Sequence, residues 1–156
     1  MNHQYYMDEA IEEAKKALSV DEVPIGCVIV FNGEIIARAH NRKEELQQVT
    51  AHAEVLAIEQ ACRFMKSWRL ENCTLYVTLE PCPMCAGTIQ QARIPVVVFG
   101  AKDPKGGSFG SNFNLNEVKG LNHYPMIESG IEEEKCSKLL KDYFKTKRNS
   151  KKTEIE

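Results

Sequence analysis

The sequence lacks any apolar run that approaches the roughly 20 residues needed by a helix that crosses a bilayer. It also lacks the pattern of a secretory signal peptide, because acidic residues such as Asp8 and Glu9 stand near its start. No internal repeat, linker or low-complexity segment interrupts the chain. We therefore expect a soluble, cytoplasmic protein with no membrane partner, made of a single domain over residues 1–156 with a polar tail at about 149–156.

A strong excess of charge is missing as well, since 20 basic residues are balanced by 22 acidic ones. This balance disfavours a protein that coats nucleic acid through bulk charge. The basic residues are unevenly spread, and residues 138–152 hold a single acid, Asp142, beside Lys138, Lys141, Lys145, Lys147, Arg148, Lys151 and Lys152. Such a run fits equally a solvated helix end whose cations complement the helix dipole and a surface that binds phosphate.

Regular cysteine spacing is also absent, and a domain of this size does not need disulfides to fold. We expect the isolated cysteines to behave as small apolar side chains: Cys27, Cys62, Cys73 and Cys136. Cys82 and Cys85 form the only tight pair. Cys-x-x-Cys between a strand and a helix is typical both of metal sites and of thioredoxin-type redox sites, so the pair alone decides neither.

Hydrophobic periodicity predicts an α/β protein. Helical spacing covers residues 4–18, a segment from a Thr50 N-cap to about Met65, one from Pro83 to about Arg93, and residues 132–148. Strands are expected over 26–31, 34–39, 74–79 and 96–100, the first two joined by the hairpin signal Asn32-Gly33. The strand–helix–strand unit over 74–100 implies parallel strands with a right-handed crossover. We expect a three-layer α/β/α sandwich with a mixed sheet.

A glycine-rich segment follows the last of these strands. Residues 101–120 contain Gly106, Gly107, Gly110 and Gly120, directly after Gly100. A loop of this length in a compact domain is usually functional or disordered.

Two predicted helix starts carry residues suited to zinc. Cys82 at an N-cap and Cys85 three residues later lie on one side of a first helical turn, where the helix dipole favours thiolate. His52, at the start of the preceding helix, adds a third ligand. A catalytic zinc takes three protein ligands and keeps one position open, whereas a structural zinc takes four. The set therefore predicts one catalytic zinc ion per chain.

Glu54 follows His52 by two residues, about 200° around a helix, so we do not expect it to bind the metal from the same face. A carboxylate beside a zinc-activated water can carry a proton to a ring nitrogen and a departing amine. Taken singly, a helical His is more often structural and a first-turn Glu more often complements the dipole. Together, His-Ala-Glu followed by Pro-Cys-x-x-Cys is the signature of zinc deaminases, and it predicts hydrolytic deamination.

With these motifs the chain resembles the cytidine deaminase superfamily, and within it the bacterial tRNA-specific adenosine deaminases. The likeness spans nearly the whole length. Besides 52–54 and 81–85, it includes E-V-P-I-G at 22–26, A-H-N at 39–41, T-L-E at 78–80, R-I-P at 93–95, G-A-K-D-P-K at 100–105 and L-N-H at 121–123.

The resemblance implies a cytidine deaminase-like fold, a homodimer, and conversion of the wobble adenosine to inosine in the anticodon loop of an arginine tRNA, with attack at C6. It makes His52, Cys82 and Cys85 the zinc ligands and Glu54 the proton shuttle. It also implies substrate contacts by Asn41, Asp103, Lys105, Asn122, His123, Tyr143, Phe144 and Arg148. Phe109 departs from the small residue expected there, and Tyr143 replaces a common Phe in a way that should preserve stacking.

Two other functions stay open. A deaminase of free guanine, cytosine or a small nucleoside uses the same motifs, but the lysine-rich last helix and the 103–105 segment favour tRNA. A thiol-disulfide protein or a zinc-stabilised binding module belongs to a different class. Neither needs a carboxylate beside the histidine, so Glu54 argues against both.

Overall fold

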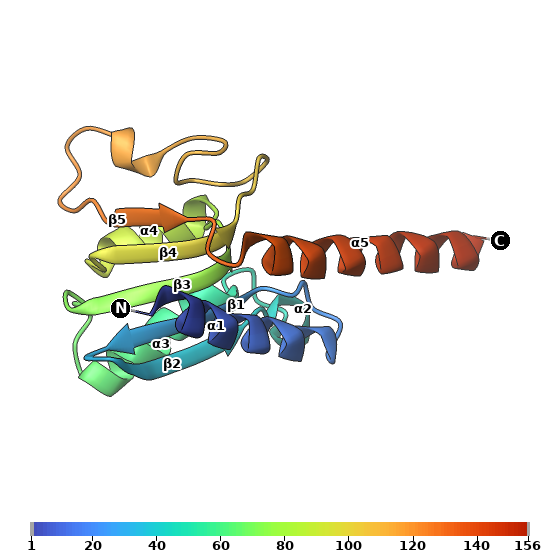
Figure 1. Cartoon of the computed structure of the whole chain (residues 1–156), viewed down its shortest axis with the longest axis horizontal. Coiled ribbons are helices and arrows are strands. Elements are labelled where there is room, and N and C mark those ends of the chain that lie inside the picture. Colours follow the sequence, from blue (N-terminus) through green and yellow to red (C-terminus); the bar gives the residue numbers. More distant parts are fainter. Residues whose placement is uncertain (1, 156) are drawn as a thin grey trace.

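The computed structural model describes the backbone of residues 2–155 and the side chains of residues 2–151. Five strands form one mixed sheet in the order β2-β1-β3-β4-β5 (Figure 1). Their bounds are Gly26–Phe31 for β1, Glu34–His40 for β2, Cys73–Leu79 for β3, Val96–Ala101 for β4 and Met126–Ser129 for β5. β1 pairs antiparallel with β2 and β3, whereas β3, β4 and β5 run parallel to one another.

Helices cover both faces of the sheet. Helix α1 (His3–Leu18) and helix α5 (Glu133–Ile155) lie on one face, and α3 (Ala53–Met65) and α4 (Pro83–Gln91) lie on the other (Figure 1). Because successive strand side chains point to opposite faces, β1 sends Val28 towards α1 and Ile29 towards α3. The predicted three-layer α/β/α sandwich with a mixed sheet is thus confirmed.

Three short elements were not predicted: α2 (Lys43–Leu46), the 3₁₀ turn η1 (Leu115–Glu117) and β5. The N-terminus of α2 is capped from a distance, because the buried carboxylate of Glu22 accepts the backbone N–H groups of Glu44 and Glu45 at 3.2 and 2.6 Å. β5 is a four-residue edge strand with largely exposed side chains, so it lacks the alternation by which a half-buried strand is found.

Several predicted bounds were wrong. Thr50 is not the N-cap of α3, since His52 holds that position. Helix α4 ends at Gln91 because Arg93 adopts a left-handed backbone with φ of 63°. Helix α5 runs to Ile155, so residues 149–155 are helical rather than a frayed tail, and this C-terminal part of the helix projects past the sheet (Figure 1).

No helix within residues 2–155 combines the length and the apolar character that a membrane span requires.

Candidate active site

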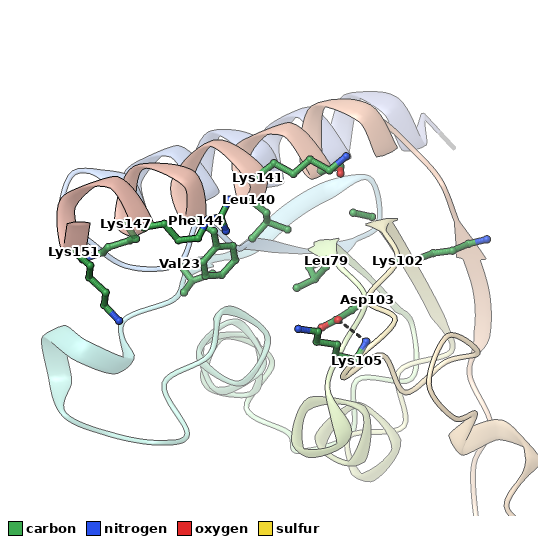
Figure 2. Close-up of a pocket in the computed structure, with 13 residues that line it drawn as sticks. Val23, Leu79, Lys102, Asp103, Lys105, Leu140, Lys141, Phe144, Lys147 and Lys151 are labelled. Atoms are coloured by element: carbon green, nitrogen blue, oxygen red, sulfur yellow. Dashed lines mark hydrogen bonds between the residues drawn. The ribbon is translucent and has the colours of Figure 1, made fainter. Parts of the chain in front are cut away.

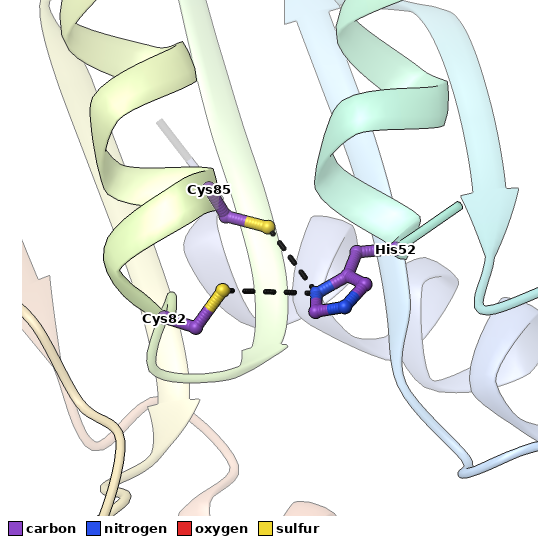
Figure 3. Close-up of side chains that lie close together, drawn as sticks. All are labelled: His52, Cys82 and Cys85. Atoms are coloured by element: carbon purple, nitrogen blue, oxygen red, sulfur yellow. Dashed lines mark hydrogen bonds between the residues drawn. The ribbon is translucent and has the colours of Figure 1, made fainter. Parts of the chain in front are cut away.

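The starts of α3 and α4 bring three potential metal ligands together (Figure 3). His52 precedes α3, Cys82 is the N-cap of α4, and Cys85 lies in its first turn. Nδ1 of His52 lies 3.7 Å from Sγ of Cys82 and 3.6 Å from Sγ of Cys85. A tetrahedral zinc with bonds of about 2.1 Å to nitrogen and about 2.3 Å to sulfur separates these atoms by about 3.6 Å. The geometry therefore fits one tetrahedral ion with an open fourth position.

The two sulfurs also fit a cation electrostatically. The hydrogen bond with Cys85 lowers the pKa of the Cys82 thiol to about 4. The same hydrogen bond holds the proton on the Cys85 thiol and, together with burial, raises the pKa of Cys85 far above its usual range; repulsion by negative charge at Glu54 and Cys82 acts in the same direction. A divalent cation between the sulfurs removes that conflict, since a coordinated thiol is deprotonated.

Glu54 lies in the first turn of α3 with 4% of its surface exposed. Burial raises the pKa of its carboxyl to about 7, and negative charge at Cys82 acts in the same direction. A hydrogen bond joins it to Cys85, yet its carboxylate is not a member of the ligand cluster. A proton-carrying group thus stands next to the metal ligands.

Asn41 follows the end of β2 and is almost buried, with 7% of its surface exposed. Its Oδ1 accepts the backbone N–H of Ala53 at 2.8 Å. This hydrogen bond holds the start of α3, and with it the neighbouring His52. The Nδ2 group, and the second lone pair of Oδ1, are left for the substrate contact implied by the resemblance.

A basic groove of about 760 Å³ runs between α5 and the end of the sheet (Figure 2). Four of the predicted substrate-contact residues line it, namely Asp103, Lys105, Phe144 and Arg148. Further cations on its walls are Lys102, Lys141, Lys147 and Lys151, while the side chain of Lys152 lies outside the described residues. Leu79, three residues before Cys82, also lines the groove, but His52, Glu54, Cys82 and Cys85 do not.

Other predicted contact residues lie elsewhere. The Tyr143 hydroxyl donates to the backbone oxygen of Asp21 at 3.4 Å, and Lys147 pairs with the carboxylate of Asp21 at 2.5 Å. Tyr143 therefore packs against the loop that follows α1, outside the groove of Phe144. Its aromatic neighbour Phe144 is 44% exposed.

Asn122 and His123 lie at the opposite end of the sheet. Nε2 of His123 is 2.6 Å from the backbone oxygen of Ile94, which precedes β4, whereas Cys82 follows the far end of the parallel strand β3. The structure thus does not bring these two residues to the metal cluster of their own chain.

The glycine-rich segment is more ordered than its composition indicates. Phe109 is buried in the core shared with α3 and α4. Glu80, noted in the sequence only within the T-L-E motif, is 2% exposed and accepts several hydrogen bonds from this segment. The signal that could have identified it is a charged residue directly after an apolar strand, because a buried charge requires partners.

A mixed sheet whose two covering helices present His and Cys-x-x-Cys beside a buried carboxylate defines the class of nucleobase deaminases. Residues 1–148 match the model of the MafB19-like deaminase family. The chain is 55% identical over 147 residues to the tRNA-specific adenosine deaminase of Bacillus subtilis (strain 168), covering 94% of this chain and 91% of that protein. It therefore belongs to the MafB19-like deaminases, among the tRNA-specific adenosine deaminases, as the sequence motifs predicted.

Solved structures agree with this placement. One, from work on A-to-I editing by tRNA:A34 deaminases at the wobble position of transfer RNA, matches with a TM-score of 0.82 and 43% identity over 87% of this chain and 99% of that chain. A guanine deaminase from Bacillus subtilis matches with a TM-score of 0.62 and 31% identity over 76% of this chain and 87% of that one. The cytidine deaminase-like fold is thereby confirmed.

Proposed function

We propose that this protein converts the wobble adenosine of a tRNA, specifically an arginine tRNA, to inosine by zinc-dependent hydrolytic deamination. The observation that carries the proposal is the His52–Cys82–Cys85 cluster with the buried carboxyl group of Glu54 beside it, in a chain that also has a basic groove along α5. The relatives named tRNA-specific adenosine deaminase support the same substrate class.

His52 Nδ1 and the sulfurs of Cys82 and Cys85 would hold one zinc ion per chain. Three ligands at tetrahedral spacing, with thiolate chemistry at two of them, support zinc over a hard cation, which prefers oxygen. When bound, the ion supplies a water that is acidic enough to give up a proton near neutral pH.

Glu54 would move the protons. Its carboxylate takes one proton as the water oxygen bonds to C6, and delivers it to ring nitrogen N1. The proton of the new C6 hydroxyl then passes through Glu54 to the exocyclic amine as the C6–N6 bond breaks, so that water and adenosine become inosine and ammonia. Burial beside Cys85 supports this role, because a proton carrier needs a fixed place at the reacting atoms.

The groove residues would bind the anticodon loop. Lys105 and Arg148 face phosphates from opposite walls, and the exposed ring of Phe144 offers a surface for base stacking. Asp103 belongs to the same wall as Lys105. Asn41 would contact the flipped nucleotide through Nδ2.

A second candidate is deamination of free guanine, favoured by the likeness to the guanine deaminase structure. The two candidates are separated by incubating the purified protein with arginine tRNA and with guanine side by side. We expect inosine in the tRNA at the wobble position and no ammonia from guanine. Ammonia from guanine with unchanged tRNA would contradict the proposal.

We also propose a homodimer that works in the cytoplasm, where tRNA is found. Because Asn122 and His123 lie at the far end of their own sheet, a second copy would allow them to reach a shared RNA. Nearby apolar side chains support a covered surface there: Tyr124 and Met126 are 44 and 70% exposed. Light scattering at micromolar concentration should give twice the chain mass, and a monomer would contradict this part.

A further inference from the structure

Glu80 joins the metal ligands to the wall of the groove. It stands directly after β3 and two residues before Cys82, with its side chain buried. Its carboxylate accepts the backbone N–H groups of Asp103, Phe109 and Ser111 at 3.1, 3.0 and 3.1 Å. The hydroxyl of Ser111 donates a further short hydrogen bond to it. One side chain therefore organises the whole 103–111 segment.

The segment wraps closely around this carboxylate. A side-chain carbon at Gly107 would overlap the carboxyl group of Glu80, so that position has no space for one. The backbone N–H of Ser108 donates to the carbonyl of Pro81 at 3.0 Å, which ties the segment to the residue next to Cys82. Asp103 closes a turn by accepting the N–H of Lys105 at 3.1 Å. The place of Lys105 in the groove thus depends on Glu80.

Only a carboxylate suits this position. Four donors converge on two oxygens, and a carboxylate offers acceptors alone. A glutamine of the same shape would turn an NH₂ group towards at least one N–H donor, and a buried donor without an acceptor is costly.

We propose that Glu80 is a positioning residue of the reaction. It fixes Asp103 and Lys105 relative to the metal ligand Cys82, and so sets the distance between the RNA backbone in the groove and the reacting base. This inference rests on the proposed tRNA substrate, because a free base makes no backbone contact.

The test compares the steady-state kinetics of Glu80→Gln and the wild-type protein on a synthetic anticodon stem-loop of arginine tRNA. We expect KM to rise by about tenfold, because the loss of one hydrogen bond to a buried charged group typically changes an equilibrium by about this factor. We expect kcat to change much less. Zinc content should stay at the wild-type level. Glu13→Gln, which alters a buried carboxylate on α1, is the matched control and should leave KM unchanged.

A double-mutant cycle ties the effect to the loop. If Glu80 acts through the 103–111 segment, adding Glu80→Gln to Lys105→Ala should raise KM much less than it does in the wild-type background. Full additivity would overturn the proposal. So would a fall in zinc content or in kcat at an unchanged KM, because either marks Glu80 as a support of the metal site alone.

Two further variants keep the test decisive if Glu80→Gln does not fold. Ser111→Ala is the milder one, because it removes only one of the four donors, whereas Gly107→Ala displaces the carboxylate; both should raise KM with zinc retained. An unchanged KM in both would overturn the proposal. A wild-type protein that does not act on the stem-loop would instead refute the proposed function, and this inference with it.

Discussion

The side-chain oxygen of Asn41 accepts the backbone N–H of Ala53 at 2.8 Å, so the end of the β1–β2 hairpin fixes the residue next to the proposed ligand His52. Groups that orient a metal ligand typically contribute 10–100-fold, that is about one to two orders of magnitude, in metal affinity or activity. Asn41→Ala should therefore weaken zinc binding by about tenfold in a chelator competition assay. Asn41→Asp keeps the oxygen that accepts the Ala53 N–H, so its zinc affinity should fall much less. Unchanged affinity in Asn41→Ala would restrict this residue to contact with substrate.

Glu54→Ala should abolish turnover and keep the metal. A positioned proton carrier contributes about 10²- to 10⁴-fold to a rate, and this carboxylate stands outside the ligand cluster. Deamination of arginine tRNA and metal analysis of the same preparation check both parts. His52→Ala is the contrasting variant and should lose the zinc as well. Loss of zinc from Glu54→Ala would refute its assignment as a shuttle.

The cysteine pair should be protected by metal. We expect about one zinc per chain, with Cys82 and Cys85 unreactive towards a thiol reagent until a chelator removes the ion. Buried Cys27 and Cys73 should stay slow in both states, which provides an internal reference. A protein that binds no metal and oxidises reversibly to a Cys82–Cys85 disulfide would instead be a redox protein.

Charge removal from the groove should change the salt dependence of RNA binding. When Lys105, Arg148 and Lys151 are all replaced by Ser, we expect a higher KM. Each phosphate contact on a single strand contributes about 0.7 to the slope of log affinity against log salt concentration, so losing three contacts should make this slope shallower by about 2. Lys15, Lys66 and Lys119 replaced together remove the same charge away from the groove and should leave the slope unchanged. Equal slopes for the two triple variants would mean that the groove does not contact phosphates.

Gly26 and Gly87 should respond to alanine in opposite directions. A side-chain carbon at Gly26 would overlap the backbone oxygen of Ala10 on α1, so Gly26→Ala should lower the free energy of unfolding by about 1–3 kcal/mol. Gly87 lies in α4, and a side-chain carbon added there would have no atom nearby. Gly87→Ala should therefore raise the free energy of unfolding by about 0.5–1 kcal/mol. Urea denaturation of the three proteins measures both. A stable Gly26→Ala variant would show that α1 moves away from the sheet at little cost.

The sequence predicted the elements that have strong local patterns. The β1–β2 hairpin was found because Asn32 and Gly33 adopt positive φ at its turn, and the start of α4 because Pro83 follows the N-cap Cys82. Elements held by distant partners were missed or misplaced. No residue pattern near α2 indicates that Glu22 caps this helix. Likewise, no pattern near Thr50 indicates that the hydrogen bond from Ala53 to Asn41 places the start of α3 at Ala53.

The candidate site likewise combines features set by local sequence patterns with features set by distant contacts. Cys82 and Cys85 share the first turn of one helix, so their proximity could be predicted from local rules, whereas the approach of His52 from another helix was predicted from the deaminase signature. The contact residues depend on how α5 and the 101–120 segment pack, which no local pattern states. Phe144 and Arg148 reach the groove, whereas Tyr143 is held outside it and His123 is bound at the other end of the sheet.

The contacts of Asp21 determine the rotational setting of α5. Tyr143 and Lys147, one helical turn apart, both bond to this residue, and Lys147 lines the groove together with Phe144 and Arg148. Successive residues of an α-helix are rotated by about 100° about its axis. If the contacts with Asp21 shifted by one residue along α5, the helix would turn by this angle and Phe144 would leave the groove. The loop after α1 thereby helps to determine which side of the last helix faces the groove.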